Sequence, residues 1–115
     1  MTKQKPIWKI RMVKDYPEAH NHLLIGEVIE LTSTFIRAKC RTFHFGTAVT
    51  GPKNVQIGAT MVRVIPWNRV EIVNELPAAF DFASAKLVRD DDGSIALQDG
   101  SKHECTIVPA YAKTY

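Results

Sequence analysis

Basic and aromatic side chains alternate along one segment in a pattern typical of nucleic-acid binding. Residues 35–45 are predicted to form a strand, and its odd-numbered positions share one face. That face carries Phe35, Arg37, Lys39, Arg41, Phe43 and Phe45. Such a strip can hold a phosphate backbone by charge and stack bases on its rings, at about 1 to 3 kcal/mol per base. The alternative is an amphipathic strand with solvated basic groups and phenylalanines packed beneath the C-terminal part of the chain.

A second candidate is the tripeptide Trp67-Asn68-Arg69, which falls in a tight turn between two predicted strands. An exposed indole beside an amide and a guanidinium can recognise a base or a peptide. The structural alternative is equally simple. Trp67 would cover the mouth of a barrel, Asn68 would suit the turn geometry, and Arg69 would face solvent.

Two cysteines and two histidines lie at spacings that place each pair on one side of a strand. Cys40 and His44 are four residues apart, and His103 and Cys105 are two apart. Their four side chains could meet around a metal ion, but the spacing matches no zinc knuckle or finger. We therefore predict no metal site and treat both cysteines as small buried apolar residues.

The sequence contains no motif that predicts catalysis. It has no Gly-rich phosphate loop, no nucleophile elbow and no recognisable Cys/His/Asp arrangement, so we expect no enzyme activity, no catalytic residue and no cofactor. The run Asp90-Asp91-Asp92 lacks the glycine spacing and distal Glu of a calcium-binding loop, and it is predicted to be a solvated turn.

Composition fits one compact domain. The chain has 115 residues with 15 basic and 12 acidic side chains. The net charge is +5 over residues 1–79 and −2 over residues 80–115. A surplus of this size is compatible with a polyanionic ligand and also with none. No run is long and apolar enough for a membrane span, and two cysteines are too few for a disulfide scaffold. We expect a cytoplasmic protein with no membrane partner.

Alternation of apolar and polar residues at period two predicts a mostly β protein. The first five strands are expected at 7–13, 23–31, 35–45, 60–65 and 69–75, with a loop over 46–58. Gly26 lies inside the second strand, where a missing side chain permits a sharp bend or a close backbone approach.

The C-terminal third has a different sequence pattern. Residues 78–85 are expected to form one or two helical turns, followed by strands at 86–89, 94–98 and 103–108. The pairs Asp92-Gly93 and Asp99-Gly100 separate these strands and tolerate the positive φ of hairpin turns, so a small meander is predicted.

Three segments resemble the Sm-like family, which includes the LSm and Hfq proteins, and more generally the SH3-like small barrels. Residues 24–31 are similar to the family's second strand with its internal glycine, 35–40 to its third strand, and 61–73 to its fourth strand, tight turn and fifth strand. The resemblance implies an all-β fold, with a small five-stranded, strongly bent barrel over residues 1–77 and a C-terminal β-hairpin extension over 78–115.

Sm-like proteins bind uridine-rich RNA through an Asp and an Asn in the turn after the second strand, and they carry an Arg-Gly pair after the fourth. This chain has Thr32 and Phe35 near the first places and Pro66-Trp67 at the second. Family members also pair the fourth strand of one subunit with the fifth of the next, which implies a ring. An apolar edge such as 61–65 needs cover from a neighbouring subunit, or from the chain's own C-terminal strands, which would give a monomer.

These observations predict a non-catalytic module that forms a homo-oligomeric ring and binds single-stranded RNA. The residues expected to contact RNA are Arg37, Lys39, Arg41, Phe43, Trp67, Asn68 and Arg69. The alternative function is a protein-interaction or structural assembly domain with no nucleic-acid ligand.

Overall fold

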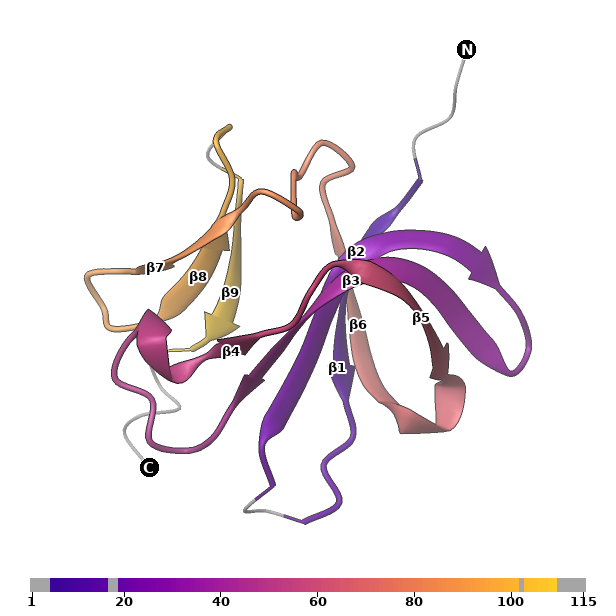
Figure 1. Ribbon diagram of the computed structural model, residues 1–115, viewed down its shortest axis with the longest axis horizontal. Coiled ribbons are helices and arrows are strands. Elements are labelled where there is room, and N and C mark those ends of the chain that lie inside the picture. The colour runs from indigo at the N-terminus through magenta and orange to yellow at the C-terminus, as the bar shows by residue number, and fades with distance from the viewer. Residues whose placement is uncertain (1–4, 17–18, 102, 110–115) are drawn as a thin grey trace.

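The computed structural model describes residues 5–16, 19–101 and 103–109, and the chain there forms two antiparallel sheets (Figure 1). These residues hold nine strands: β1 (Ile7–Met12), β2 (Asn21–Leu31), β3 (Phe35–Phe45), β4 (Gln56–Ile57), β5 (Met61–Pro66), β6 (Val70–Leu76), β7 (Lys86–Arg89), β8 (Ile95–Gln98) and β9 (Glu104–Val108). Two short 3₁₀ helices complete the described elements: η1 (Pro52–Asn54) precedes β4, and η2 (Trp67–Arg69) joins β5 to β6.

The larger sheet, sheet A, has the strand order β5-β3-β2-β1-β6, with the short β4 beside the far end of β3. Its longest ladder joins β2 to β3 and pairs Leu31 with Ile36 near the turn and His22 with His44 at the other end, with a one-residue shift of register between Val28 and Glu30. The reversal between these strands is fixed by Thr32, whose hydroxyl oxygen accepts hydrogen bonds from the backbone N–H groups of Thr34 and Phe35. A side chain that satisfies the backbone in this way holds a tight turn.

Gly26 marks a close approach between β2 and β3. A Cβ atom at this position would lie 2.1 Å from the carbonyl oxygen of Lys39 and 2.5 Å from the Cα of Cys40. Only a residue without a side chain allows two backbones to come this near, and such a point lets a strand bend sharply. The prediction that Gly26 permits a close backbone approach is confirmed.

Sheet A curls around a small core of its own. Buried side chains from β1, β2, β3 and β5 meet there: Ile10, Leu24, Val28, Ile36, Ala38, Cys40 and Ile65. Trp8 and Met12 of β1, and Val70 and Val73 of β6, pack against this cluster. All five long strands of the sheet therefore contribute to one interior, which requires the sheet to be strongly curved. On β3 the contributing residues are the even-numbered ones, as the alternation predicts.

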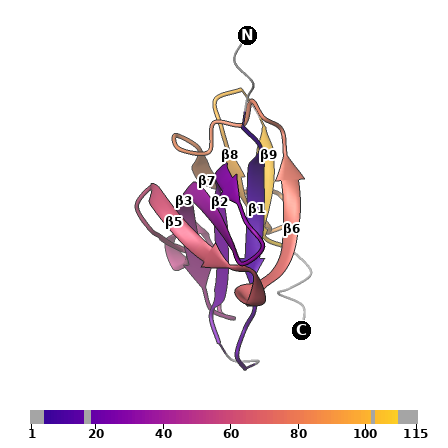
Figure 2. The ribbon, with the colours of Figure 1, turned by 90° about the vertical axis from the view of Figure 1, so that its right-hand side faces the viewer.

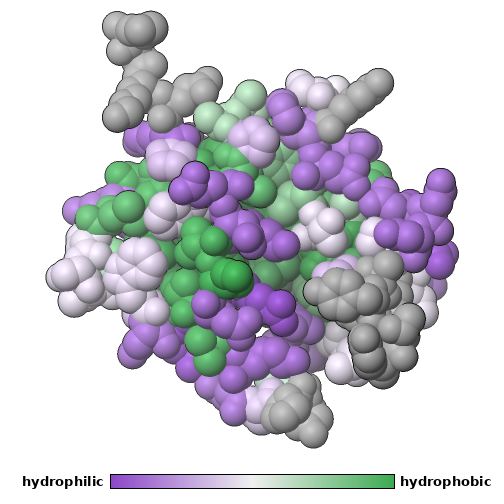
Figure 3. All heavy atoms as spheres, turned by 180° about the vertical axis from the view of Figure 1, so that it is seen from behind, coloured by the Kyte–Doolittle hydropathy of each residue, from purple (hydrophilic) through white to green (hydrophobic). Residues whose placement is uncertain are grey.

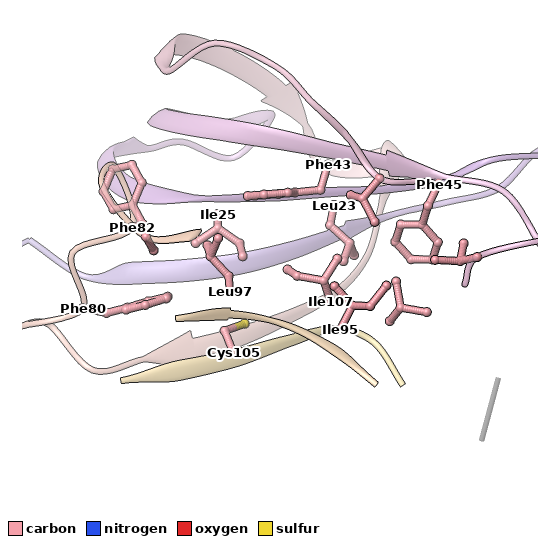
Figure 4. Packing of buried hydrophobic residues seen from close by; sticks show 14 of the residues in the cluster. Leu23, Ile25, Phe43, Phe45, Phe80, Phe82, Ile95, Leu97, Cys105 and Ile107 are labelled. Carbon is pink, nitrogen blue, oxygen red and sulfur yellow. The ribbon is translucent and has the colours of Figure 1, made fainter. Parts of the chain in front are cut away.

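The second and larger core lies between sheet A and the three-stranded sheet B, whose order is β7-β8-β9. Its side chains come from both sheets and from the segment between them (Figure 4). Among them are Leu23, Ile25 and Phe43 from sheet A, Ile95, Leu97 and Ile107 from sheet B, and Phe80 and Phe82 from the connection. Because each fully buried side chain of this kind contributes about 1.5 to 3 kcal/mol, the cluster holds the C-terminal strands against the N-terminal ones.

The two hairpin turns of sheet B, at 92–93 and 99–100, are stabilised in different ways. Gly93 has a φ of 88°, as expected for the Asp92-Gly93 pair. The second turn depends instead on the carboxylate of Asp99, which is 1% exposed and accepts hydrogen bonds from the backbone N–H groups of Asp81, Ser101 and His103. Burial by itself would raise the pKa of Asp99, but the hydrogen bonds from Asp81 and His103 outweigh it and lower the pKa.

Three features differ from the sequence-based expectations. The predicted loop 46–58 contains a short strand, β4, because residues 56–57 pair with the end of β3. Residues 78–85 form isolated hydrogen-bonded turns instead of a helix, such as the one closed by Ala85 N–H and the carbonyl of Asp81. Within residues 61–76 no ladder joins β5 to β6, so the hydrogen-bonded sheet is open at these two strands.

Candidate functional site

Two of the three phenylalanines of the predicted nucleic-acid strip lie inside the protein, whereas Phe35 is only partly buried. Phe43 is 0% exposed and Phe45 is 7% exposed, and both rings pack in the core between the two sheets (Figure 4). A ring enclosed in this way has no face to offer a base. Phe43 and Phe45 therefore occupy the positions described by the amphipathic-strand alternative, beneath the C-terminal strands.

Arg41, in the middle of the same strip, is bound within the protein. Its Nη1 donates hydrogen bonds to the carbonyl oxygens of Phe82 at 2.7 Å and Ala85 at 2.8 Å, and its guanidinium lies 5.5 Å from the centre of the Phe43 ring. Partial burial lowers the pKa of Arg41. The side chain thus fastens the connection between the sheets to β3, and this role explains a basic residue on a largely buried face.

Arg37 and Lys39 are the exposed basic groups of β3, on the part of its outer face that sheet B does not cover. The Nη1 of Arg37 lies 3.8 Å from a carboxylate oxygen of Glu30, and both side chains are about half exposed, at 51% and 50%. An exposed pair at this separation is weak, on the order of 0 to 1 kcal/mol, so a ligand can replace it. Lys39 makes no side-chain hydrogen bond or ion pair with any residue that the structure describes.

The turn 67–69 forms η2 and is tied to two other parts of sheet A. The indole Nε1 of Trp67 donates to the carbonyl of Thr32 at 2.8 Å, which joins η2 to the β2–β3 turn. Arg69 pairs with Asp15 at 2.9 Å, while the Val13 N–H donates to the Arg69 carbonyl. Trp67, Asn68 and Arg69 are all exposed, although the indole donor of Trp67 and part of the Arg69 guanidinium bond within the protein.

The two cysteines and two histidines that share strands do not meet. Cys40 lies in the core of sheet A and Cys105 in the core between the sheets, so the two thiols belong to separate clusters. His44 stacks on His22, and His103 bonds to Asp99 through Nδ1 at 3.2 Å. Over the described residues, no three His, Cys, Asp or Glu side chains are grouped in a way that could hold a metal ion.

The stacked pair of His22 and His44 is a feature that sequence reasoning missed. The two rings are in register across β2 and β3, with centroids 3.9 Å apart, beside a cavity of about 310 Å³ that His20 also lines. Burial, then His44 and Arg63, lower the pKa of His22 to about 4, and burial, His20 and Arg63 lower the pKa of His44. The pair is therefore held neutral near pH 7. The turn at 32–34 does not give this pairing by itself, because a β-bulge between Val28 and Glu30 shifts the β2–β3 register by one residue.

Exposed apolar side chains lie on both end strands of sheet A, and also on β2, where Leu31 is 51% exposed. β5 pairs only with β3, and its Met61, Val62 and Val64 are 51%, 53% and 57% exposed. At the other end β6 pairs only with β1, and its Ile72 is 50% exposed. Figure 2 shows the two strands diverging from the short turn that joins them, and in Figure 3 apolar atoms surface among hydrophilic ones. In the part of the chain that the structure describes, sheet B pairs with neither edge.

Comparisons of the chain with family models, with curated proteins and with solved structures give no match. Among the described residues, no helix has the length and apolar character needed to cross a membrane. Any conclusion about function must therefore come from the residues themselves.

Proposed function

We propose that this protein is a non-catalytic assembly module whose copies join into a homo-oligomer through the free edges of β5 and β6. One observation carries the proposal. Within the described residues, each end strand of sheet A has one unpaired edge, with three half-exposed apolar side chains on β5 and one on β6, and the C-terminal sheet packs on a face of sheet A instead of on either edge. Unpaired apolar edges are templates for pairing with another chain, and single-chain proteins usually cover or charge them.

The two edges differ from each other, so pairing β5 of one copy with β6 of the next repeats head to tail. Such a contact produces a ring when the rotation between copies closes. The arrangement of sheet A supports this proposal and the Sm-like resemblance. Five strands surround one small core, in the order β5-β3-β2-β1-β6, with a 3₁₀ turn between β5 and β6. We propose that the unit is a small, nearly closed barrel completed by its neighbours.

The test is a double variant, Val62→Glu/Val64→Glu, which places two carboxylates on the β5 edge. Both valines are more than half exposed, so the core of the subunit is unchanged. We expect the wild-type protein to have a molar mass that is a multiple of 12.9 kDa by light scattering, and the variant to have 12.9 kDa. Leu31→Glu is the control, because Leu31 is 51% exposed but lies on β2. A wild-type monomer, or a double variant that keeps the assembly, would refute the proposal.

Single-stranded RNA binding is a second candidate, and the exposure of Arg37 and Lys39 favours it. With about two phosphate contacts, the affinity for a single strand should fall about sevenfold when salt rises from about 50 to 200 mM. Fluorescence polarisation with uridine-rich and adenine-rich oligonucleotides measures this dependence. Arg37→Ala/Lys39→Ala should abolish it and Lys86→Ala, on β7, should not. If no salt-sensitive binding is found, the assembly domain has no nucleic-acid ligand.

A further inference from the structure

A cavity of about 260 Å³ opens at the seam where sheet B stops covering sheet A. One wall is the last strand of sheet B, with Ile107 and Pro109, and the other is the outer face of sheet A. We call this space the seam cavity. It lies apart from the β5 edge and from the exposed basic groups of β3. It shares Ile72 and Asn74 with the proposed β6 edge, but assembly does not account for its other lining residues on β1, β2, β3 and β9.

The polar groups that line the seam cavity are either positively charged or neutral. They are the cations Lys9 and Arg11 of β1 and the carboxamides of Asn21 and Asn74, and no Asp or Glu lines the space. Lys9 and Asn74 are neighbours in the β1–β6 register. A concave site lined by cations and amide groups, with no carboxylate, favours an anion.

The apolar side chains that line the seam cavity form a rigid wall beside these cations. Leu23, Phe45 and Ile107 are 3%, 7% and 2% exposed, so their positions are fixed by the core between the sheets. Ile72 is half exposed and forms part of the rim. A site with a fixed apolar wall and a few placed polar groups is the usual form of a small-molecule site.

We propose that the seam cavity binds a small monocarboxylate with a one-ring apolar body. Its volume equals roughly eight or nine water molecules at about 30 Å³ each, which is below the size of a drug-like ligand and suits one ring with a short acid chain. The ring would lie against Leu23, Phe45 and Ile107. The carboxylate would lie between Lys9 and Arg11.

Both cations line the cavity and keep donors that a carboxylate can accept. Lys9 Nζ donates to the carbonyl oxygen of Thr106 at 2.7 Å, which fixes the ammonium at the seam and leaves two of its three donors. Arg11 Nε lies 3.3 Å from Glu71, and these side chains are 45% and 49% exposed. An exposed pair of this kind is weak, so a ligand carboxylate competes with it at little cost.

The test is an NMR titration of the ¹⁵N-labelled protein with 3-phenylpropionate, and with the neutral 3-phenylpropanamide as the matched ligand. For eleven heavy atoms we expect a Kd on the order of 1 mM for the acid. Amide shifts should be confined to the residues of β1, β2, β3, β6 and β9 that line the cavity, and their immediate neighbours. The amide ligand and the Lys9→Met variant should each bind at least about tenfold more weakly. Lys86→Met is the control, and its Kd should equal that of the wild type.

Three results would overturn the proposal: no saturable shifts, saturable shifts elsewhere in the protein, or equal affinity for the acid and the amide. The comparison of acid with amide uses the wild-type protein alone, so it holds even if Lys9→Met is poorly folded. Ligand binding is read from local amide shifts and not from molar mass. A failure of the assembly proposal would therefore leave this result unchanged.

Discussion

Replacing Gly26 with alanine tests whether the close approach of β2 and β3 shapes sheet A. The added Cβ would lie 2.1 Å from Lys39 O and 2.5 Å from Cys40 Cα, where ordinary contact begins near 3.4 Å. Both obstructing atoms belong to the backbone of β3, so no side-chain rotation relieves the clash. The two strands must separate by about 1 Å at the centre of the longest ladder of the sheet.

The cost can be estimated from these contacts. Overpacking a well-packed core costs about 1 to 3 kcal/mol, and disturbing one or two ladder hydrogen bonds adds about 1 kcal/mol each. Alanine recovers about 0.5 to 1 kcal/mol because it loses less backbone entropy than glycine in a strand. We therefore expect Gly26→Ala to lower the free energy of unfolding by about 3 kcal/mol. This is a large share of the 5 to 15 kcal/mol that is typical of a domain.

Urea denaturation at 25 °C measures this change, and the midpoint should fall by about 1 to 2 M. Gly51→Ala and Gly100→Ala are the controls, because a Cβ at either position meets no atom within 4 Å. Each control should change the free energy of unfolding by less than about 0.5 kcal/mol. If Gly26→Ala is as stable as the controls, the argument that this residue permits the curvature of sheet A is refuted.

Two further predictions concern the side chains that join the elements. Arg41→Met leaves the carbonyl oxygens of Phe82 and Ala85 without their donor, so it should lower the free energy of unfolding by about 2 to 3 kcal/mol. Arg37→Met is the control. It removes only an exposed ion pair, so it should lower the free energy of unfolding by less than about 0.5 kcal/mol. Equal losses in denaturation curves of the two variants would contradict the role given to Arg41. The fold lowers the pKa of His22 to about 4 from 6.5, so its contribution to stability is complete above pH 6.5 and declines as the pH falls toward 4. After a discount for partial exposure, the loss of stability between pH 6.5 and pH 4 amounts to about 1 to 2 kcal/mol. His22→Phe should reduce the pH dependence of the unfolding free energy by that amount. An unchanged pH profile would disprove the prediction.

The strands of sheet A could be predicted closely because their signals are local. Residues 35–45 form β3 at the predicted bounds, and the other four long strands begin and end within two residues of expectation. Each of these strands turns one face toward the small core, so the alternation of apolar and polar residues shows which side chains point inward. β4 has no such signal, because its two residues are a strand only through their pairing with β3.

The candidate site could be predicted less well, because it depends on what covers each face. Phe43 and Arg37 have the same parity on β3, yet sheet B buries the first and leaves the second exposed. Arg41 finds its partners more than 40 residues away, at Phe82 and Ala85. No local pattern encodes contacts at that separation. The edge of β5 was predictable as a pairing hazard, but only the placement of sheet B shows that the described C-terminal strands do not cover it.

Cross-linking between two single-cysteine additions tests the β5-to-β6 contact most directly. Val64→Cys and Ile72→Cys each place a thiol on one free edge, both positions are at least half exposed, and the native Cys40 and Cys105 are buried. With a short bismaleimide, we predict a cross-linked dimer when the two variant proteins are mixed and none when either is treated alone. No cross-link in the mixture, or an equal yield from Val64→Cys alone, would contradict the assembly of copies through β5 and β6.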